Sequence, residues 1–377
     1  MIFVPDISFH PNIANFVIGI TRQCNFRCKY CCFSGKYSNM RTHSDKHMSR
    51  ETMDQAINFI KTNVAENQTV FVSFYGGEAL MQMEIIEYAV TQLLIIFDNR
   101  IEFDISTNGW MLNMPMVKRI LQIPRAAISV SLDGIKDIHD KNRIHISGSP
   151  TFDKIVYNLK EFKKSYPEEY KKRIRILMTM GSLNDISQVD MEFNEVSKLL
   201  GERPMLVSHI LPNFKENLLY RDSYKCKIKF FEQALAFEKN GTNNLHVHIL
   251  NELRQKALPV IENEGNLNNM ILHTCLNNLK SCFISTDGDL YACEKVNDKL
   301  KIGNIWQGFN KSKICNIIIK YCLRRNLLCH NCAYIYKCHR CLADLNFSFN
   351  EHQAMCSDYI ENVKLSNTFV KKYETTI

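Results

Sequence analysis

Stretches rich in valine, isoleucine and phenylalanine alternate with stretches of helical periodicity between residues 14 and 213. Several of these strand-like stretches are apolar at consecutive positions and therefore on both faces, which is typical of parallel strands covered by helices. We therefore predict six strands, at residues 15–21, 69–76, 101–107, 126–132, 173–180 and 204–211.

Helical segments separate the predicted strands. Ser49 has the position of an N-cap, and apolar residues recur after it at three- and four-residue spacing from Met53 to Val64. Residues 81–97 and 151–166 show the same periodicity. Six strand–helix units in succession predict an α/β fold, a partial (β/α)6 TIM-like barrel two units short of eight. In such folds ligands lie at the C-terminal ends of the strands.

The composition changes twice along the chain. Residues 1–220 form the predicted barrel, residues 221–274 look polar and helical and form a predicted bridge, and residues 275–377 form a cysteine-rich domain. Ten of the 15 cysteines lie between residues 275 and 356. We find no secretory signal and no apolar run long enough to cross a bilayer, so we expect a cytoplasmic protein without membrane association. In a reducing cytosol these cysteines indicate metal or redox chemistry rather than disulfides.

The formal net charge of +8 is compatible with an acidic partner. Iron–sulfur clusters bound by thiolates carry negative charge and would offset part of it. The cysteine-rich part also lacks the interleaved aromatic and basic residues of a nucleic-acid-binding surface. We therefore expect no nucleic acid as a partner.

Three cysteines follow the first predicted strand at the spacing C-x3-C-x2-C: Cys24, Cys28 and Cys31. Three thiolates leave one iron of a [4Fe–4S] cluster without a protein ligand, so that a small molecule can bind there. The alternative is structural zinc, which needs four ligands, and the next histidines are His43 and His47. Cys32, next to the last cysteine, is expected to be a bystander that points away from the cluster.

The stretch CNFRCKYC resembles the signature of radical S-adenosylmethionine (SAM) enzymes, and so does its place after the first strand. The resemblance implies that SAM binds the open iron and is cleaved to a 5′-deoxyadenosyl radical. It implies further SAM-binding residues at the ends of later strands. These are Tyr30 near the adenine, the segment Gly76–Gly77–Glu78 at the amino group, Thr107 and Asn108 near the ribose, then Ser131, Arg143 and Leu211.

Several of these positions also have ordinary structural interpretations. The GGE segment could be a simple turn, although glycines let a backbone approach a ligand closely. Arg143 either pairs with the SAM carboxylate or forms a surface salt bridge. Leu211 either lines the adenine pocket or packs in the core.

The cysteines after residue 274 resemble the SPASM extension of radical SAM enzymes, with one departure: two residues instead of three separate Cys338 from Cys341. The resemblance implies two auxiliary [4Fe–4S] clusters, hence three in total, with zinc as the alternative. The first would be bound by Cys275, Cys282, Cys293 and Cys341. The second would be bound by Cys329, Cys332, Cys338 and Cys356. Cys282 is the weakest of these assignments, and without it the first auxiliary cluster would have an open site.

Enzymes with SPASM domains mostly modify peptides or proteins. We favour a maturase that installs an oxidative change, a thioether or carbon–carbon crosslink, in a ribosomally synthesised peptide. The alternative is an anaerobic sulfatase-maturating enzyme that converts Cys or Ser to formylglycine. In such enzymes an aspartate that acts as a base follows the cysteine of a G-x4-C segment, which in this chain runs from Gly288 to Cys293. This chain has Glu294 at that position. Glu294 is either a general base or a solvated side chain. An interpretation of another class is an iron–sulfur electron-transfer protein.

The resemblance also implies partners. A flavodoxin or ferredoxin would supply electrons, and a peptide or protein would be the substrate. Peptide maturases often carry an N-terminal leader-binding domain, for which we see no room, so we expect a separate leader-binding protein or recognition through the barrel and the bridge. The basic stretch at residues 311–325 could contact an acidic leader, or it could be the solvated face of a helix.

Overall fold

The computed structural model describes most of the chain. The continuous described ranges are 11–36, 40–179, 205–207, 224–241 and 279–329, and isolated positions such as Cys275, Cys332 and Cys356 are described as well. Three predicted site residues, Leu211, Cys338 and Cys341, lie outside the described residues.

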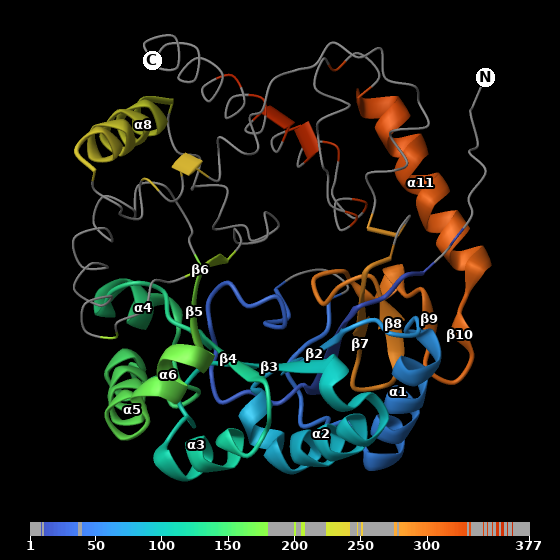
Figure 1. Cartoon of the computed structure of the whole chain (residues 1–377). Helices are drawn as coiled ribbons and strands as arrows, with labels where there is room; N and C mark the ends of the chain where they lie inside the picture. The colour runs from blue at the N-terminus through green and yellow to red at the C-terminus, as the bar shows by residue number, and fades with distance from the viewer. Residues whose placement is uncertain are drawn as a thin grey trace.

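One mixed sheet organises the fold, with the strand order β10-β9-β8-β7-β1-β2-β3-β4-β5-β6 (Figure 1). Neighbouring strands from β7 through β1 to β6 pair in parallel, and the strands from β7 to β10 pair antiparallel. The first six strands are β1 (Asn15–Thr21), β2 (Val70–Gly76), β3 (Ile101–Thr107), β4 (Ala126–Ser131), β5 (Ile174–Thr179) and β6 (Met205–Val207). The predicted α/β fold with a parallel sheet is confirmed.

The C-terminal part of the chain extends this sheet. Strand β7 (Ser281–Ile284) pairs in parallel with β1, with Phe16 opposite Cys282. The other strands on this side are β8 (Asp289–Tyr291), β9 (Gly303–Asn304) and β10 (Gly308–Phe309). The first strand of the predicted third domain therefore belongs to the same sheet as the predicted barrel, a long-range pairing for which the local sequence carries no signal.

Helices cover one face of the sheet, as Figure 1 shows for α1, α2, α3 and α5. Ser49 caps α1 (Arg50–Asn63) as predicted, its hydroxyl accepting a hydrogen bond from the Thr52 amide at 3.1 Å. The predicted helices at 81–97 and 151–166 correspond to α2 (Met83–Phe97) and α5 (Phe152–Ser165). Three short helices were not predicted because so few residues give little periodicity: α3 (Met114–Leu121), α4 (Lys136–Asn142) and α6 (Pro167–Arg173).

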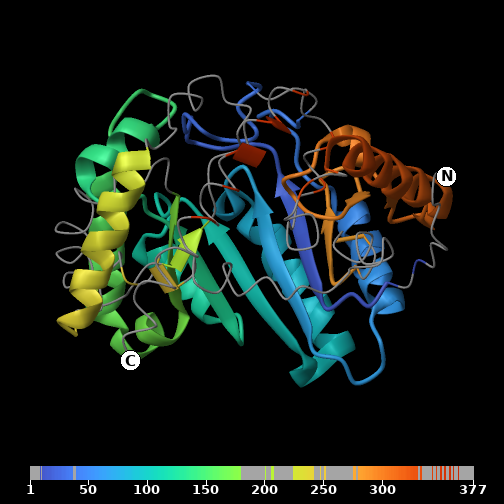
Figure 2. The same ribbon diagram turned by 90° about the horizontal axis from the view of Figure 1, so that it is seen from above.

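Two longer helices lie at opposite ends of the sheet in both views (Figures 1 and 2). Helix α8 (Tyr224–Lys239) falls within the predicted bridge. Helix α11 (Lys311–Cys329) contains the predicted basic stretch, and its residues Ile314, Ile318 and Tyr321 belong to the same apolar core as the sheet. The C-terminal part is thus packed against the sheet and is not a loosely attached appendage.

The expectation that no apolar run is long enough to cross a bilayer is wrong by length and composition: among the described residues, one helical stretch, Ala79–Arg100, meets both criteria. It comprises the 3-10 turns η1 (Ala79–Gln82) and η2 (Asp98–Arg100) on either side of α2. Residues of α2 such as Ile86, Ala89 and Leu93 are fully buried in the core beside the sheet. Packing in the core accounts for the apolar composition of this stretch.

Candidate active site

The three cysteines of the C-x3-C-x2-C segment lie on the loop that follows β1. Cys24 is nearly buried, whereas Cys28 and Cys31 are half-buried. Backbone amides hold two of the thiols: Phe26 donates to Cys24 Sγ at 3.3 Å and Phe33 donates to Cys31 Sγ at 3.4 Å. The structure therefore brings the three predicted ligands together at the C-terminal end of the first strand.

Electrostatics indicate what these thiols can bind. Burial, followed by the carboxylate of Glu78 and the other two cysteines, raises the pKa of Cys24 to about 12. Burial also raises the pKa of Cys28 to about 12, although nearby Arg143 acts in the opposite direction. Thiols with pKa values this high lose their protons only when a positive charge lies beside them, and coordinated iron would supply that charge. The donor set fits an iron–sulfur cluster on this criterion.

His43 lies beside the cysteine loop, with its Nε2 3.6 Å from Cys31 Sγ. In the described part of the chain, however, no three Cys, His, Asp or Glu side chains converge closely enough to hold one metal ion. Thiols that each bind a different iron of a cluster need no such convergence. The described residues of this loop therefore do not form the closed four-ligand site that structural zinc needs.

The glycines at the end of β2 pack against the segment that leads into Cys24. A Cβ at Gly76 would lie 2.3 Å from the Thr21 carbonyl oxygen, and one at Gly77 would lie 2.1 Å from the Gln23 carbonyl oxygen. The amides of Gly77 and Glu78 donate to these same oxygens at 2.8 and 2.9 Å. The close approach predicted for these glycines is thus made to the protein's own backbone, and it fixes where the cysteine loop begins.

Glu78 is turned into the protein and is 1% exposed. Its carboxylate accepts hydrogen bonds from the Thr107 hydroxyl and the Asn108 amide, each at 2.7 Å, and from the Leu80 amide at 3.0 Å. Burial raises its pKa, and these three donors counteract the rise. Glu78 therefore joins the end of β2 to the end of β3.

Asn108 extends this connection to the cysteine loop. Its side-chain amide donates to Asn25 Oδ1 at 2.7 Å and lies 3.9 Å from Cys24 Sγ. The predicted residues of the second and third strand ends thus form one network with the first cysteine, and Thr107 serves it by donating to Glu78.

At the end of β4, Arg143 forms a salt bridge with Asp133, from Nε to Oδ2 at 2.8 Å. Both side chains are buried, so the interpretation of Arg143 as a surface salt bridge is wrong. Tyr30 also donates to Asp133 Oδ2, and the guanidinium lies 5.4 Å from the Tyr30 ring centroid. This cluster brings the predicted residues Tyr30 and Arg143 beside Cys28, whereas the predicted Ser131 is half-buried at the end of β4.

His139, whose role the sequence did not suggest, is hydrogen-bonded to the backbone segments that carry this salt bridge. Its Nδ1 accepts from the Asp133 amide at 3.2 Å and its Nε2 lies 3.0 Å from the Thr151 hydroxyl, which donates to the Arg143 carbonyl at 2.6 Å. Burial lowers the pKa of His139 to about 4. The neutral ring therefore links the backbones of Asp133 and Arg143.

A second wall of the site comes from β2 and the β7–β8 hairpin. Burial raises the pKa of Tyr75, with further contributions from Cys32 and Glu294, so these groups lie near one another. Cys32 makes a side-chain hydrogen bond with Cys31, which lowers the pKa of Cys32 and raises that of Cys31. The Cys32 thiol therefore lies beside Cys31, whereas we expected it to be a bystander that points away from the cluster.

Arg41 holds this wall together and is only 3% exposed. It donates to the carbonyls of Glu294 and Val296 at 2.6 and 2.9 Å, and its guanidinium lies 4.9 and 4.8 Å from the ring centroids of Phe283 and Tyr291. Sequence reasoning missed Arg41 because its partners lie some 250 residues further along the chain. Tyr75 carried a weak signal, since it directly precedes the two glycines at the end of a strand.

The later cysteines differ in their exposure. Cys275 is exposed and Cys293 half-buried. Cys329 ends α11, and the Cys332 amide donates to its carbonyl at 2.9 Å. Cys329 Sγ also lies 3.8 Å from His352 Nε2, and Cys356 is half-buried. Among the predicted auxiliary ligands that the structure describes, Cys329 and Cys332 thus lie within one hydrogen-bonded turn.

Cys282 is 0% exposed within β7 and belongs to the apolar core. It pairs with Phe16, whose ring packs against Phe59 of α1, so its side chain lies on the helix-covered face of the sheet. Burial raises its pKa to about 12, opposed by a hydrogen bond with the backbone of Tyr291. These surroundings are those of a small apolar core residue.

The chain is similar to a known family and to several characterised proteins. Residues 18–190 match the Radical SAM superfamily. A cysteine-type anaerobic sulfatase-maturating enzyme of Clostridium novyi is 25% identical over 338 residues, covering 84% of this chain and 83% of that protein. The solved structure of native anSMEcpe with bound AdoMet superposes with a TM-score of 0.65 at 20% identity and covers 96% of this chain and 100% of that chain. The same protein with bound AdoMet and Cp18Cys peptide gives a TM-score of 0.64 at 19% identity, covering 98% and 100%.

Proposed function

Because residues 18–190 form a radical SAM domain, we propose that this protein is a radical SAM maturase that oxidises a peptide substrate. The observation that carries the proposal is the meeting of four strand ends at one loop. Cys24, Cys28 and Cys31 lie in contact with the Glu78–Thr107–Asn108 network on one side and with the buried Asp133–Arg143 pair on the other. An electron-transfer protein would need three thiolates and a fourth ligand. It would not need the buried hydrogen-bond network and salt bridge that flank these cysteines.

The three cysteines would hold a [4Fe–4S] cluster, and SAM would bind at its open iron. A reduced cluster held there would supply the electron for reductive cleavage of SAM. The backbone at Gly76–Gly77, the side chains of Tyr30, Asn108 and Ser131, and Arg143 would line the SAM site, with Leu211 as a further candidate. Thr107 and Glu78 act as positioning residues, since their polar atoms already bind each other.

Some of the guanidinium N–H groups of Arg143 already make hydrogen bonds within the protein. Its Nε binds Asp133, and one terminal nitrogen lies 3.4 Å from the Thr179 hydroxyl. A guanidinium has five N–H donors in a fixed fork, so further donors remain for a carboxylate. We propose that Asp133 orients Arg143 for the SAM carboxylate.

Glu294 and Tyr75 would face the substrate. Arg41 donates a hydrogen bond to the backbone carbonyl of Glu294 and thereby fixes the backbone position of this glutamate. We propose Glu294 as the base that accepts the proton released when the substrate is oxidised. The Tyr75 hydroxyl, close to the same carboxylate, would help to orient the reacting residue.

For the remaining cysteines we propose two auxiliary clusters, three in all. Cys329, Cys332, Cys338 and Cys356 would bind one, and Cys275, Cys293 and Cys341 the other. The apolar surroundings of Cys282 on the helix-covered face support a role in the core instead, which would leave the second of these clusters with a free coordination position. A flavodoxin or ferredoxin in a cytoplasmic setting would be the reductant.

The choice of modification has two candidates. We favour an oxidative crosslink in a ribosomally made peptide, since Glu294 stands where sulfatase maturases have aspartate. Formylglycine formation is the second candidate, because the Clostridium novyi relative that covers most of this chain is a sulfatase-maturating enzyme.

Mass spectrometry with a hydrazide probe separates these outcomes. The reconstituted enzyme is incubated without oxygen with SAM, a reductant and either the peptide encoded beside it or a sulfatase peptide. A crosslink gives loss of two hydrogens and no hydrazide adduct, whereas formylglycine gives an aldehyde that reacts with the probe. Failure to consume SAM under these conditions would favour an electron-transfer protein and sink the proposal.

A further inference from the structure

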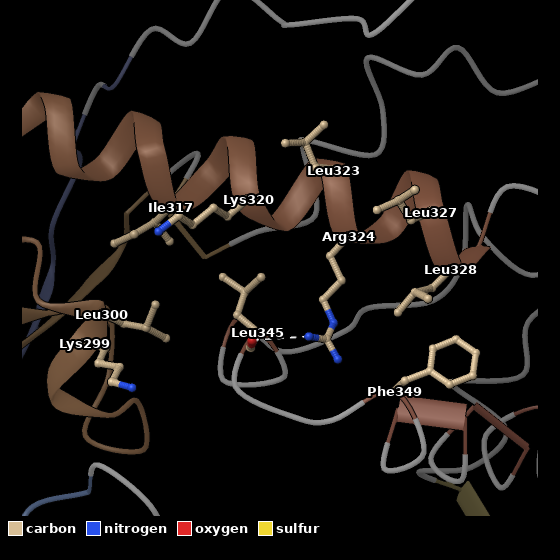
Figure 3. A pocket seen from close by; sticks show the side chains of 10 residues that line it. All are labelled: Lys299, Leu300, Ile317, Lys320, Leu323, Arg324, Leu327, Leu328, Leu345 and Phe349. Carbon is tan, nitrogen blue, oxygen red and sulfur yellow. Dashed lines mark hydrogen bonds between the residues drawn. The ribbon is translucent and has the colours of Figure 1, made fainter.

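A groove of about 590 Å³ lies far from the cysteine loop in sequence, along one side of α11 (Figure 3). Its other walls are the 3-10 turn η4 (Asp298–Leu300) and two described residues of the C-terminal segment, Leu345 and Phe349. The lining residues from α11 are Ile317, Lys320, Leu323, Arg324, Leu327 and Leu328. The volume is in the range of sites that bind several side chains of a ligand.

The groove combines an apolar floor with a basic rim. Leu300, Ile317 and Leu328 supply apolar surface, while Leu327 and Phe349 are 75% and 55% exposed at its open end. Exposed large apolar side chains beside a hollow are typical of protein-binding surfaces. Isolated exposure of one leucine would carry no such meaning, but here the two lie at one site.

All charged residues among the described lining are cations: Lys299, Lys320 and Arg324. Arg324 donates to the Leu345 carbonyl at 3.3 Å, which Figure 3 shows as a contact across the groove. The whole of α11 contains lysine and arginine but no aspartate or glutamate. The groove therefore favours a partner that is apolar on one side and acidic around it.

The wall of the groove that α11 forms is rigidly mounted. The neighbouring side of α11 buries Ile314, Ile318 and Tyr321 in the core that also contains the sheet. A wall fixed in this way needs little ordering when a partner binds, which lowers the entropic cost of binding.

We propose that this groove docks an acidic amphipathic segment of the peptide substrate, outside the part that is modified. The proposal rests on the proposed function, since it assigns a recognition site to the same substrate. An amphipathic helix places apolar side chains at i, i+3, i+4 and i+7, and these would enter the floor while its acidic residues meet the three cations. Docking there tethers the reacting segment and raises its concentration at the cysteine loop without any contact to the reacting residue.

A peptide fits this surface better than the other polyanions do. Nucleic acid is bound through phosphates and stacked bases, and an apolar floor of leucine and isoleucine offers neither partner. A membrane surface could contact the exposed Leu327 and Phe349, but it would leave the recessed Leu300 and Ile317 uncovered.

Fluorescence anisotropy of the full-length reconstituted enzyme tests the assignment. The probe is a labelled helical peptide of about 20 residues with leucine at the four anchor spacings and glutamate elsewhere; a matched probe has lysine for glutamate. We expect the glutamate probe alone to bind. K320E should weaken binding several-fold and K320E/R324E about tenfold or more, with an effect that shrinks as salt rises. The matched control is K311E, an exposed lysine on the side of the same helix that faces away from the groove, and it should leave the Kd within about twofold.

Several results would overturn the proposal: equal binding of both probes, equal effects of K311E and K320E/R324E, or no binding of the glutamate probe at ~100 µM. Displacement of the probe by phosphatidylserine vesicles, but not by unlabelled peptide, would assign the surface to membranes. SAM cleavage by the wild-type enzyme without peptide is measured in parallel. A wild-type enzyme that does not cleave SAM refutes the proposed function, whereas one that cleaves SAM but fails the binding test refutes only the groove.

Discussion

The buried pair Asp133–Arg143 gives the sharpest quantitative expectation. The side chain of Asp133 is fully buried and that of Arg143 is 9% exposed. The carboxylate accepts from Arg143 Nε at 2.8 Å, from the Thr179 amide at 3.0 Å and from the Tyr30 hydroxyl. Arg143→Met removes the only cation bound to this carboxylate within the described residues and leaves a buried charge with two neutral donors.

Breaking a buried pair in this way costs about 3–5 kcal/mol, because the remaining charge has lost its partner in a poorly solvated site. Asp133→Asn should cost a similar amount by stranding the guanidinium. The double variant D133N/R143M carries neither charge, so its cost should fall short of the sum of the single costs by about 1–3 kcal/mol. The free energy of unfolding is measured by urea titration of the iron-free protein, followed by far-ultraviolet circular dichroism.

The outcome separates two accounts of Arg143. A cost below about 1 kcal/mol for Arg143→Met, or additive single costs, would mean that the pair behaves like an exposed salt bridge. That result would refute the argument that Asp133 holds Arg143 beside the cysteine loop.

Three further predictions concern the same surround. Gly77→Ala places a Cβ 2.1 Å from the Gln23 carbonyl oxygen, so the reconstituted protein should lose about four irons. Gly148→Ala strains a backbone with a φ of +83° but its Cβ meets nothing within 4 Å, so it should keep its iron, and equal iron in both variants would contradict the steric argument. His139 has a pKa lowered from 6.5 to about 4, so the unfolded chain binds a proton first as the pH falls, and about 3 kcal/mol of stability should be lost between pH 6.5 and pH 4. In His139→Gln this slope should flatten, and an unchanged pH profile of unfolding would exclude the assignment. Cys282→Ala should retain the iron content of the wild type, and loss of about four irons per chain would restore Cys282 as a ligand.

Local sequence patterns accounted for most of the strands. The predicted bounds of residues 15–21 and 101–107 agree with β1 and β3, and those of the second, fourth and fifth strands are within one residue at each end. These segments alternate or run apolar over six or seven residues and are bounded by polar turns, which is a local property. The cap at Ser49 is local as well.

The sequence predicted which residues lie at the site better than it predicted the hydrogen bonds between them. The sequence placed Glu78, Thr107 and Asn108 at successive strand ends, but it could not show that Glu78 binds the other two. Hydrogen bonds between strand ends depend on the packing of the whole sheet. Arg41 and the β7 pairing were missed for the same reason, since both join segments more than 200 residues apart.

The central claim is that Cys24, Cys28 and Cys31 hold a cluster with a free position for SAM. The most direct test is to reduce the anaerobically reconstituted protein with dithionite in the presence of SAM and to quantify 5′-deoxyadenosine by liquid chromatography and mass spectrometry. The wild type should form it, and Cys28→Ala should form none above the protein-free background. Equal product from Cys28→Ala, or none from a wild type that has bound its iron, would contradict the account.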